Sequence, residues 1–104
     1  MADFVREVNS LVQKRENLHP DDPAIQLIWH DLVNLLKSNE ESAIAFLEQR
    51  SKETELYWLC EIFEDLSAEF QSRAFIHCLL ELQKKYPDLD MKQDIEYAIQ
   101  SIEE

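Results

Sequence analysis

The chain contains no glycine in its 104 residues. Average usage of about 7% would supply several, and glycine is the residue that tolerates the positive φ of tight hairpin turns and the close approach of backbone to phosphate. Its absence excludes the Gly-rich Walker and dinucleotide-binding loops and hairpin turns of the Asn-Gly type. Nucleotide-dependent chemistry is therefore not expected.

Apolar residues recur three and four positions apart along the whole chain, which is the period of amphipathic helices. The pattern breaks where Asp22 precedes Pro23, and again at Pro87. The inward-facing residues form six stripes: Phe4, Val8, Leu11 and Val12; Ile25, Ile28, Trp29, Leu32, Leu35 and Leu36; Ala43, Ile44, Phe46 and Leu47; Leu56, Leu59, Phe63, Leu66 and Phe70; Phe75, Cys78, Leu79, Leu82 and Tyr86; Ile95, Ala98, Ile99 and Ile102.

These stripes predict an all-α fold with a single helical domain over residues 1–104. Short loops imply five or six antiparallel helices, arranged either as a HEAT-like stack of helical hairpins or as a compact bundle. The predicted starts of four helices depend on capping residues, and Ser51 or Thr54 is expected to cap the fourth helix. Ser38 with Glu41 has the spacing of a capping box, Ser72 is expected to cap the fifth helix, and Asp88 or Asp90 the last one.

The net charge of −12 is concentrated in the second part of the chain. Residues 1–39 hold four basic and six acidic residues, whereas residues 40–104 hold six basic and sixteen acidic ones. A field of this sign repels phosphate backbones and anionic membranes, so direct nucleic-acid binding and membrane binding are disfavoured. A basic protein partner is favoured, and an acidic surface that only maintains solubility is the alternative.

Two cysteines, Cys60 and Cys78, are too few for a disulfide framework and are not spaced as a zinc knuckle. Both fall near core stripes, where they most simply act as small apolar residues. The first residues carry an acid where a secretory signal needs positive charge, and no stretch approaches the ~20 apolar residues of a membrane span. We therefore expect a soluble cytoplasmic protein.

The fourth helix carries large residues on two sides. Opposite its core stripe lie aromatic and acidic residues, with Glu64 at the edge of the set: Tyr57, Trp58, Glu61, Asp65 and Glu69. Binding hot spots favour Trp and Tyr, and carboxylates beside them steer and accept hydrogen bonds from Lys or Arg. These six residues form the predicted partner-binding site. The alternatives are that another helix covers Tyr57 and Trp58, or that this face is a homodimer contact.

No catalytic, cofactor-binding or metal-binding residues are predicted. Glu61, Glu64 and Asp65 lack a histidine at the Glu-x-x-His spacing of helical di-metal sites, and carboxylates on an exposed helix are usually solvated. His77 with Glu81 one turn later is expected to be a surface helix pair. The chain is therefore expected not to be an enzyme and to carry no cofactor.

Three segments, Trp58–Ser67, Phe70–Ser72 and Leu82–Leu89, carry a family resemblance. Across residues 56–99 the chain resembles small acidic helical immunity proteins of bacterial polymorphic-toxin and contact-dependent growth-inhibition systems. The resemblance implies a bacterial cytoplasmic protein that binds and neutralises one cognate toxin domain, often a basic nuclease. The competing interpretation is a HEAT-like intracellular adaptor or scaffold that uses the same face to bind a basic protein or peptide.

Overall fold

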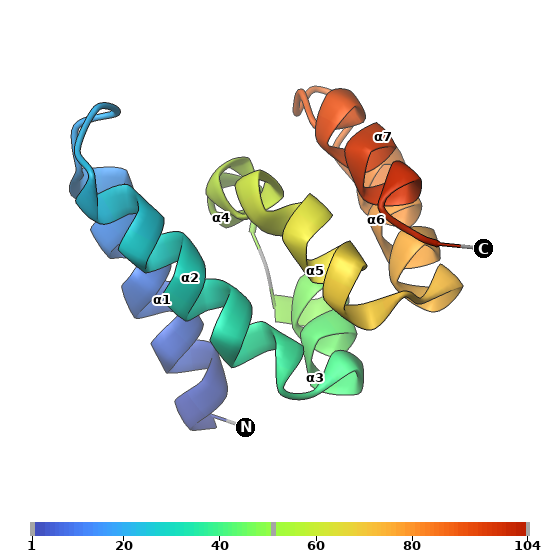
Figure 1. The fold of residues 1–104 in the computed structure, drawn as a ribbon, viewed down its shortest axis with the longest axis horizontal. Coiled ribbons are helices and arrows are strands. Elements are labelled where there is room, and N and C mark those ends of the chain that lie inside the picture. The colour runs from blue at the N-terminus through green and yellow to red at the C-terminus, as the bar shows by residue number, and fades with distance from the viewer. Residues whose placement is uncertain (1, 51, 104) are drawn as a thin grey trace.

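Three helical hairpins lie side by side in the structure (Figure 1). The computed structural model describes residues 2–50 and 52–103, and every regular element within them is helical, which confirms the all-α prediction. In chain order the elements are α1 (Ala2–Asn17), α2 (Ala24–Lys37), α3 (Glu40–Ala45), the π-helical turn η1 (Phe46–Arg50), α4 (Glu53–Leu59), the 3-10 turn η2 (Cys60–Ile62), α5 (Phe63–Phe70), α6 (Arg73–Lys85) and α7 (Lys92–Gln100).

The hairpins pair α1 with α2, the α3–η1 segment with the α4–η2–α5 segment, and α6 with α7 (Figure 1). The second helices of the three hairpins form one row, in which α5 contacts α2 on one side and α7 on the other. The first helices form a second row, in which α6 contacts α3 and η1. In this second row, Phe4 of α1 packs edge-on against Phe46 of η1, with ring centroids 6.1 Å apart. The fourth helical segment therefore lies between the first and the last hairpin.

One hydrophobic core runs through all three hairpins. The predicted stripes supply most of its largest fully buried members, among them Leu36, Leu56, Phe63, Phe75 and Leu79, whereas Ile62 and Met91 are buried but lie outside those stripes. The radius of gyration of 12.8 Å matches the value of about 13 Å for a compact domain of this length. The apolar period of the sequence thus predicted which face of each helix is buried.

Helix starts follow the predicted cap at one position and differ at others. Lys52 is the N-cap of α4, so Thr54 lies inside that helix, and Ser51 lies outside the described residues. Ser72 Oγ accepts a hydrogen bond of 3.4 Å from the Phe75 N–H and begins α6, as predicted. Asn39, and not Ser38, caps α3, because its Oδ1 accepts a hydrogen bond of 2.9 Å from the Ser42 N–H. The predicted Ser38 cap is wrong by one residue, because the Ser38 hydroxyl donates to the Leu35 carbonyl oxygen at 2.8 Å and the neighbouring asparagine supplies the cap.

The last helix begins differently from the prediction. Met91 occupies the N-cap of α7 and makes no side-chain cap hydrogen bond, so neither Asp88 nor Asp90 caps this helix. Met91 is 1% exposed, and burial of its side chain positions this start. Ile99, predicted to face inward, is 37% exposed because the Ile95 side of α7 packs on the core and leaves Ile99 at the edge.

Helix α5 ends without the glycine that commonly adopts a left-handed C-terminal conformation. Gln71 takes this conformation instead, at φ 47° and ψ 49°. Its side-chain Nε2 donates to the carbonyl oxygens of Ala68 at 3.0 Å and Ser101 at 2.8 Å, and its Oε1 accepts from the Glu103 N–H at 2.7 Å. These bonds join the end of α5 to the residues that follow α7.

The 3-10 turn η2 interrupts the fourth helix between α4 and α5. The predicted core stripe nevertheless stays buried on both sides of this turn, because Leu56, Leu59, Phe63 and Leu66 are each at most 1% exposed. Within the turn, Ile62 is also 1% exposed, and Glu61 bonds to Arg15 of α1.

Candidate partner-binding site

A charged cluster joins α1, α2 and η2 beneath the predicted site. Glu61 accepts two hydrogen bonds of 2.8 Å from Arg15, Nε to Oε1 and Nη2 to Oε2, and Trp29 Nε1 donates to Glu61 Oε1 at 3.0 Å. The Arg15 guanidinium also lies 4.6 Å from the ring centroid of Trp58. Arg15 is only 7% exposed, so its charge requires these partners. The cluster therefore holds η2 against the first hairpin.

Two of the six predicted site residues are partly covered by the chain itself. Trp58 packs against the hydrophobic core and meets Tyr57 edge-on, with ring centroids 4.8 Å apart. The Glu61 side chain is 26% exposed, and both of its oxygens are already bonded. The alternative in which another helix covers these two aromatic residues therefore holds for Trp58, which Arg15 of α1 covers. It does not hold for Tyr57, which is 59% exposed.

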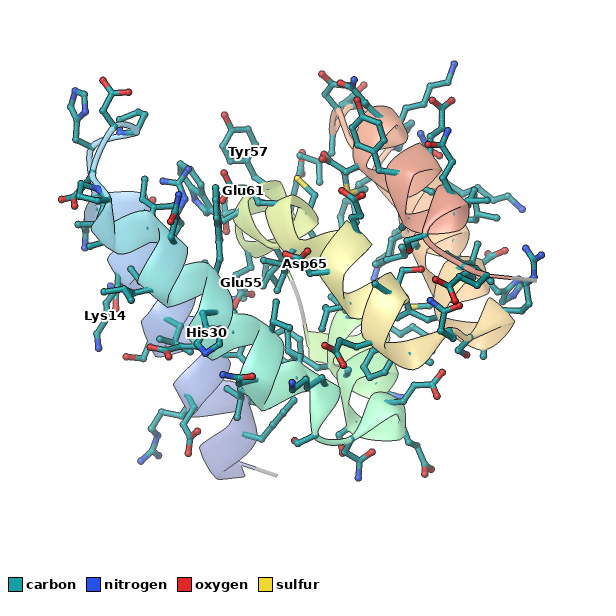
Figure 2. The ribbon with its side chains drawn as sticks, viewed as in Figure 1. Lys14, His30, Glu55, Tyr57, Glu61 and Asp65 are labelled. Atoms are coloured by element: carbon teal, nitrogen blue, oxygen red, sulfur yellow. The ribbon has the colours of Figure 1, made fainter. Side chains whose placement is uncertain are left out.

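The other four predicted residues, Tyr57, Glu64, Asp65 and Glu69, are exposed. Figure 2 shows Tyr57 projecting from the α4 end of the segment and Asp65 further along it, beside the gap toward α2. Glu69 Oε1 lies 3.8 Å from Lys37 Nζ, with both side chains at least 40% exposed. Within residues 2–50 and 52–103, no cation pairs with Glu64 or Asp65.

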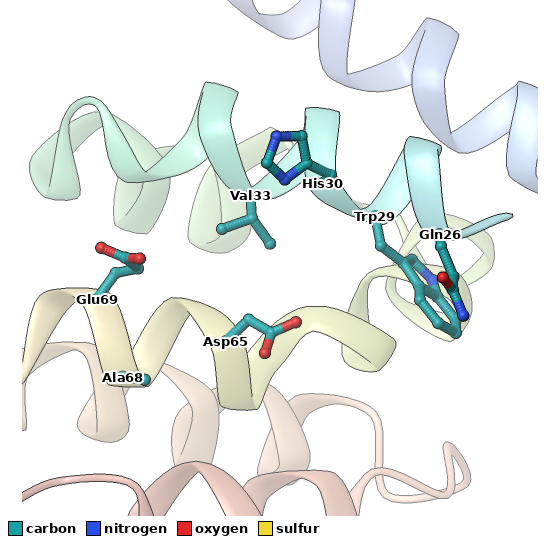
Figure 3. Close-up of a pocket in the computed structure, with 7 residues that line it drawn as sticks. All are labelled: Gln26, Trp29, His30, Val33, Asp65, Ala68 and Glu69. Carbon is teal, nitrogen blue, oxygen red and sulfur yellow. The ribbon is translucent and has the colours of Figure 1, made fainter. Parts of the chain in front are cut away.

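A groove between α2 and α5 brings two of these carboxylates next to α2 residues (Figure 3). Its volume is about 480 Å³. It is open to solvent and lined by Gln26, Trp29, His30 and Val33 of α2 and by Asp65, Ala68 and Glu69 of α5. The predicted site did not include the α2 residues. Trp29 has core spacing and His30 lies on the polar side of α2, and nothing in the sequence places either one beside α5.

The acidic surface continues past η2 to the start of α7. Burial raises the pKa of the Asp94 carboxyl, a hydrogen bond from Cys60 opposes this shift, and the negative charges of Asp90 and Glu61 add to it. Burial, with Asp94 and Glu61 nearby, likewise raises the pKa of the Cys60 thiol to about 12. Burial also raises the pKa of the Cys78 thiol to about 12, with Glu48 adding to the shift. Both thiols therefore remain neutral near pH 7.

Three further features bear on the expectations from the sequence. His77 Nε2 and Glu81 Oε1 lie 3.9 Å apart on α6, with both side chains exposed, which confirms the predicted surface pair. In the part of the chain that the structure describes, no three or more His, Cys, Asp or Glu side chains are grouped to hold a metal ion. No helix among the described residues has both the length and the apolar character to cross a membrane.

Comparison of the chain with known proteins identifies no relative. No protein-family model matches the chain, and neither a curated protein nor a solved structure matches it. The sequence of this chain and the surface formed by α2, α4 and α5 are therefore the basis for inferring its function.

Proposed function

We propose that the protein is a bacterial cytoplasmic immunity protein that binds and neutralises a cognate basic toxin domain, such as a nuclease. The observation that carries the proposal is the exposed Tyr57 together with Glu64 and Asp65 on α5, which pair with no cation among the residues that the structure describes. A nuclease needs a basic surface to hold phosphates. An acidic surface with an aromatic anchor is complementary to such a partner.

The net charge of −12 supports fast capture of a basic partner. Long-range attraction lifts association above the ~10⁵–10⁷ M⁻¹s⁻¹ that is typical of docking without steering. Fast association matters for an inhibitor that must reach the toxin before the toxin acts. In this mechanism the carboxylates on α5 govern the association rate, and Tyr57 governs the dissociation rate.

Trp58 and Glu61 have a supporting part in this mechanism. Arg15 contacts the Trp58 ring and bonds both oxygens of Glu61. Neither side chain is free to pair with a partner as fully as Tyr57 or Asp65. Their contribution is to hold α4 and η2 in place, so that Tyr57 and the α5 carboxylates are pre-organised before binding.

The test begins with the gene neighbourhood, since an immunity protein is expected to be encoded next to the C-terminal coding region of a large secreted toxin. The purified toxin domain is mixed with the protein in stopped-flow and dissociation experiments. Tyr57→Ala should speed dissociation at least about 10-fold, as expected for a hot-spot aromatic. The exposed Tyr97 of α7 supplies the matched control, Tyr97→Ala.

The carboxylates are tested by charge-matched variants. Glu64→Gln with Asp65→Asn should slow association more than Glu41→Gln with Glu96→Gln, which removes the same charge from exposed positions on α3 and α7. Equal slowing by both pairs would assign the effect to net charge alone. A chain that fails to bind the toxin domain, or that fails to protect cells expressing it, would contradict the proposed function.

A HEAT-like intracellular adaptor is the second candidate, favoured by the row of helical hairpins with an open groove between α2 and α5. It predicts a basic peptide or regulatory protein as the partner and no toxin gene nearby. Affinity capture from the native cytoplasm with the intact chain and with Tyr57→Ala, followed by mass spectrometry, separates the two. Light scattering tests the third use of this surface, a homodimer contact.

A further inference from the structure

We infer that the groove between α2 and α5 receives an arginine side chain of the partner, with the Asp65 and Glu69 carboxylates as acceptors and the Trp29 indole as one wall (Figure 3). This inference rests on the proposed function, because it names the chemistry by which the acidic surface recognises a basic protein. It also assigns a binding role to α2, which contributes none of the six residues predicted from the sequence.

The groove has the size and lining that a long basic side chain requires. Its volume of about 480 Å³ lies within the range of about 300–1,000 Å³ that is usual for ligand sites. Val33 and Ala68 supply apolar surface for the methylene groups of the stem. The carboxylates of Asp65 and Glu69 rise from α5 into the space beside α2 (Figure 3).

The acceptors in this groove have unused capacity. No cation pairs with Asp65 among the residues that the structure describes. Within the described part of the chain, Glu69 pairs only with Lys37, at 3.8 Å, which is longer than the ~2.7–2.9 Å of a charge-assisted hydrogen bond. A guanidinium entering the groove therefore gains acceptors at the cost of only one weak, exposed ion pair.

The neighbouring cluster favours arginine over lysine as the occupant. Arg15 is held within the same chain by two hydrogen bonds to one carboxylate and by the face of an indole ring, that of Trp58. Planar guanidinium groups suit this combination of carboxylate and aromatic surface better than an ammonium does. The lining of the groove likewise includes a carboxylate, Asp65, and an indole, Trp29. Trp29 is already oriented by its hydrogen bond to Glu61.

The probe is a pentapeptide with arginine flanked by alanines, blocked at both ends, and its counterpart in which neutral citrulline replaces arginine. NMR titration of the protein should show saturable shifts of the Trp29 indole N–H and of the Gln26 and Ala68 amides with the arginine peptide only. Asp65→Asn with Glu69→Gln should weaken this binding at least about 5-fold, whereas Glu41→Gln with Glu96→Gln should change it less than about 2-fold.

A second variant tests the same site, but here we expect binding of the arginine peptide to become stronger. Lys37→Gln frees Glu69 from its only ion pair within the described residues, so it should strengthen binding of the arginine peptide by about 2-fold or more. Equal shifts with the citrulline peptide, shifts centred outside the groove, or equal losses in the two double variants would overturn the inference.

The toxin domain separates this inference from the proposed function. Unchanged binding of the toxin by the Asp65→Asn and Glu69→Gln variant would overturn the arginine site and leave the proposed function in place. Arginine-specific binding in the groove by a protein that binds no toxin would contradict the proposed function and keep the groove as an arginine site.

Discussion

Arg15 of α1 and Glu61 of η2 are joined by two hydrogen bonds of 2.8 Å, although they are 46 residues apart in the sequence. The same carboxylate accepts the indole N–H of Trp29, so one acidic side chain connects both helices of the first hairpin to the turn between α4 and α5. The first hairpin therefore fixes the position of η2 next to the candidate binding surface, and it contributes Trp29 to the groove of that surface.

Replacing Arg15 by methionine should destabilise the fold. Arg15→Met keeps much of the apolar volume but leaves the Glu61 carboxylate without its cation, and the Glu61 side chain is only 26% exposed. We expect a loss of about 2 kcal/mol in the free energy of unfolding, since hydrogen bonds to charged groups contribute about 1.5–3 kcal/mol. Urea unfolding measures this loss of stability. The control is Lys14→Met, which replaces the neighbouring, exposed basic residue. Equal midpoints for the two variants would show that the cluster is not a stabilising element.

The C-terminus of α5 can be tested with two variants of Gln71. Gln71→Ala and Gln71→Gly both remove the amide bonds to Ala68, Ser101 and Glu103. Only alanine retains the steric cost of a side chain at φ 47°. Gln71→Gly should therefore be more stable than Gln71→Ala by about 1 kcal/mol in urea or thermal unfolding. An alanine variant as stable as the glycine variant would contradict a left-handed backbone at this position.

The buried thiols predict a loss of stability in alkaline solution. Burial raises the pKa of Cys60 and of Cys78 from 9.0 to about 12 in the native state. Between these values the unfolded thiol is ionised and the native thiol is neutral, so the unfolded state binds fewer protons. The free energy of unfolding should fall as pH rises above 9, by up to about 1.4 kcal/mol per pH unit for each thiol.

Comparison with Cys78→Ala isolates one thiol from the lysines and tyrosines that titrate in the same range. The variant should show a shallower decline in the free energy of unfolding between pH 9 and pH 11, measured by urea unfolding at each pH. Parallel declines for the two proteins would mean that the Cys78 thiol ionises as readily in the native state as in the unfolded one.

A buried hydroxyl connects α5 to α7. Ser67 is fully buried, and its Oγ donates a hydrogen bond of 2.6 Å to the Ala98 carbonyl oxygen. Ser101 Oγ donates to the same oxygen at 2.7 Å, so this acceptor stays satisfied when Ser67 is replaced. Ser67→Ala should cost about 1 kcal/mol of unfolding free energy. Ser10→Ala on the exposed side of α1 serves as control, and indistinguishable unfolding of the two variants would remove this bond from the stabilising contacts.

Local patterns in the sequence predicted the helices and their buried faces. Amphipathic spacing depends on residues three and four apart, and a serine cap depends on residues within one turn, so both are encoded over short distances. The stripe of Leu56, Leu59, Phe63 and Leu66 is buried for this reason, and Ser72 begins α6 as expected. Of the predicted binding residues, Tyr57, Glu64, Asp65 and Glu69 are at the surface.

The packing of the helices against one another determines which of those residues remain available to a partner. Arg15 of α1 binds the Glu61 carboxylate and covers one face of Trp58. The groove likewise depends on α2 packing beside α5. A helical wheel describes one helix at a time, whereas these contacts join residues that are brought together by the packing of whole helices, and no local spacing in the sequence specifies that packing.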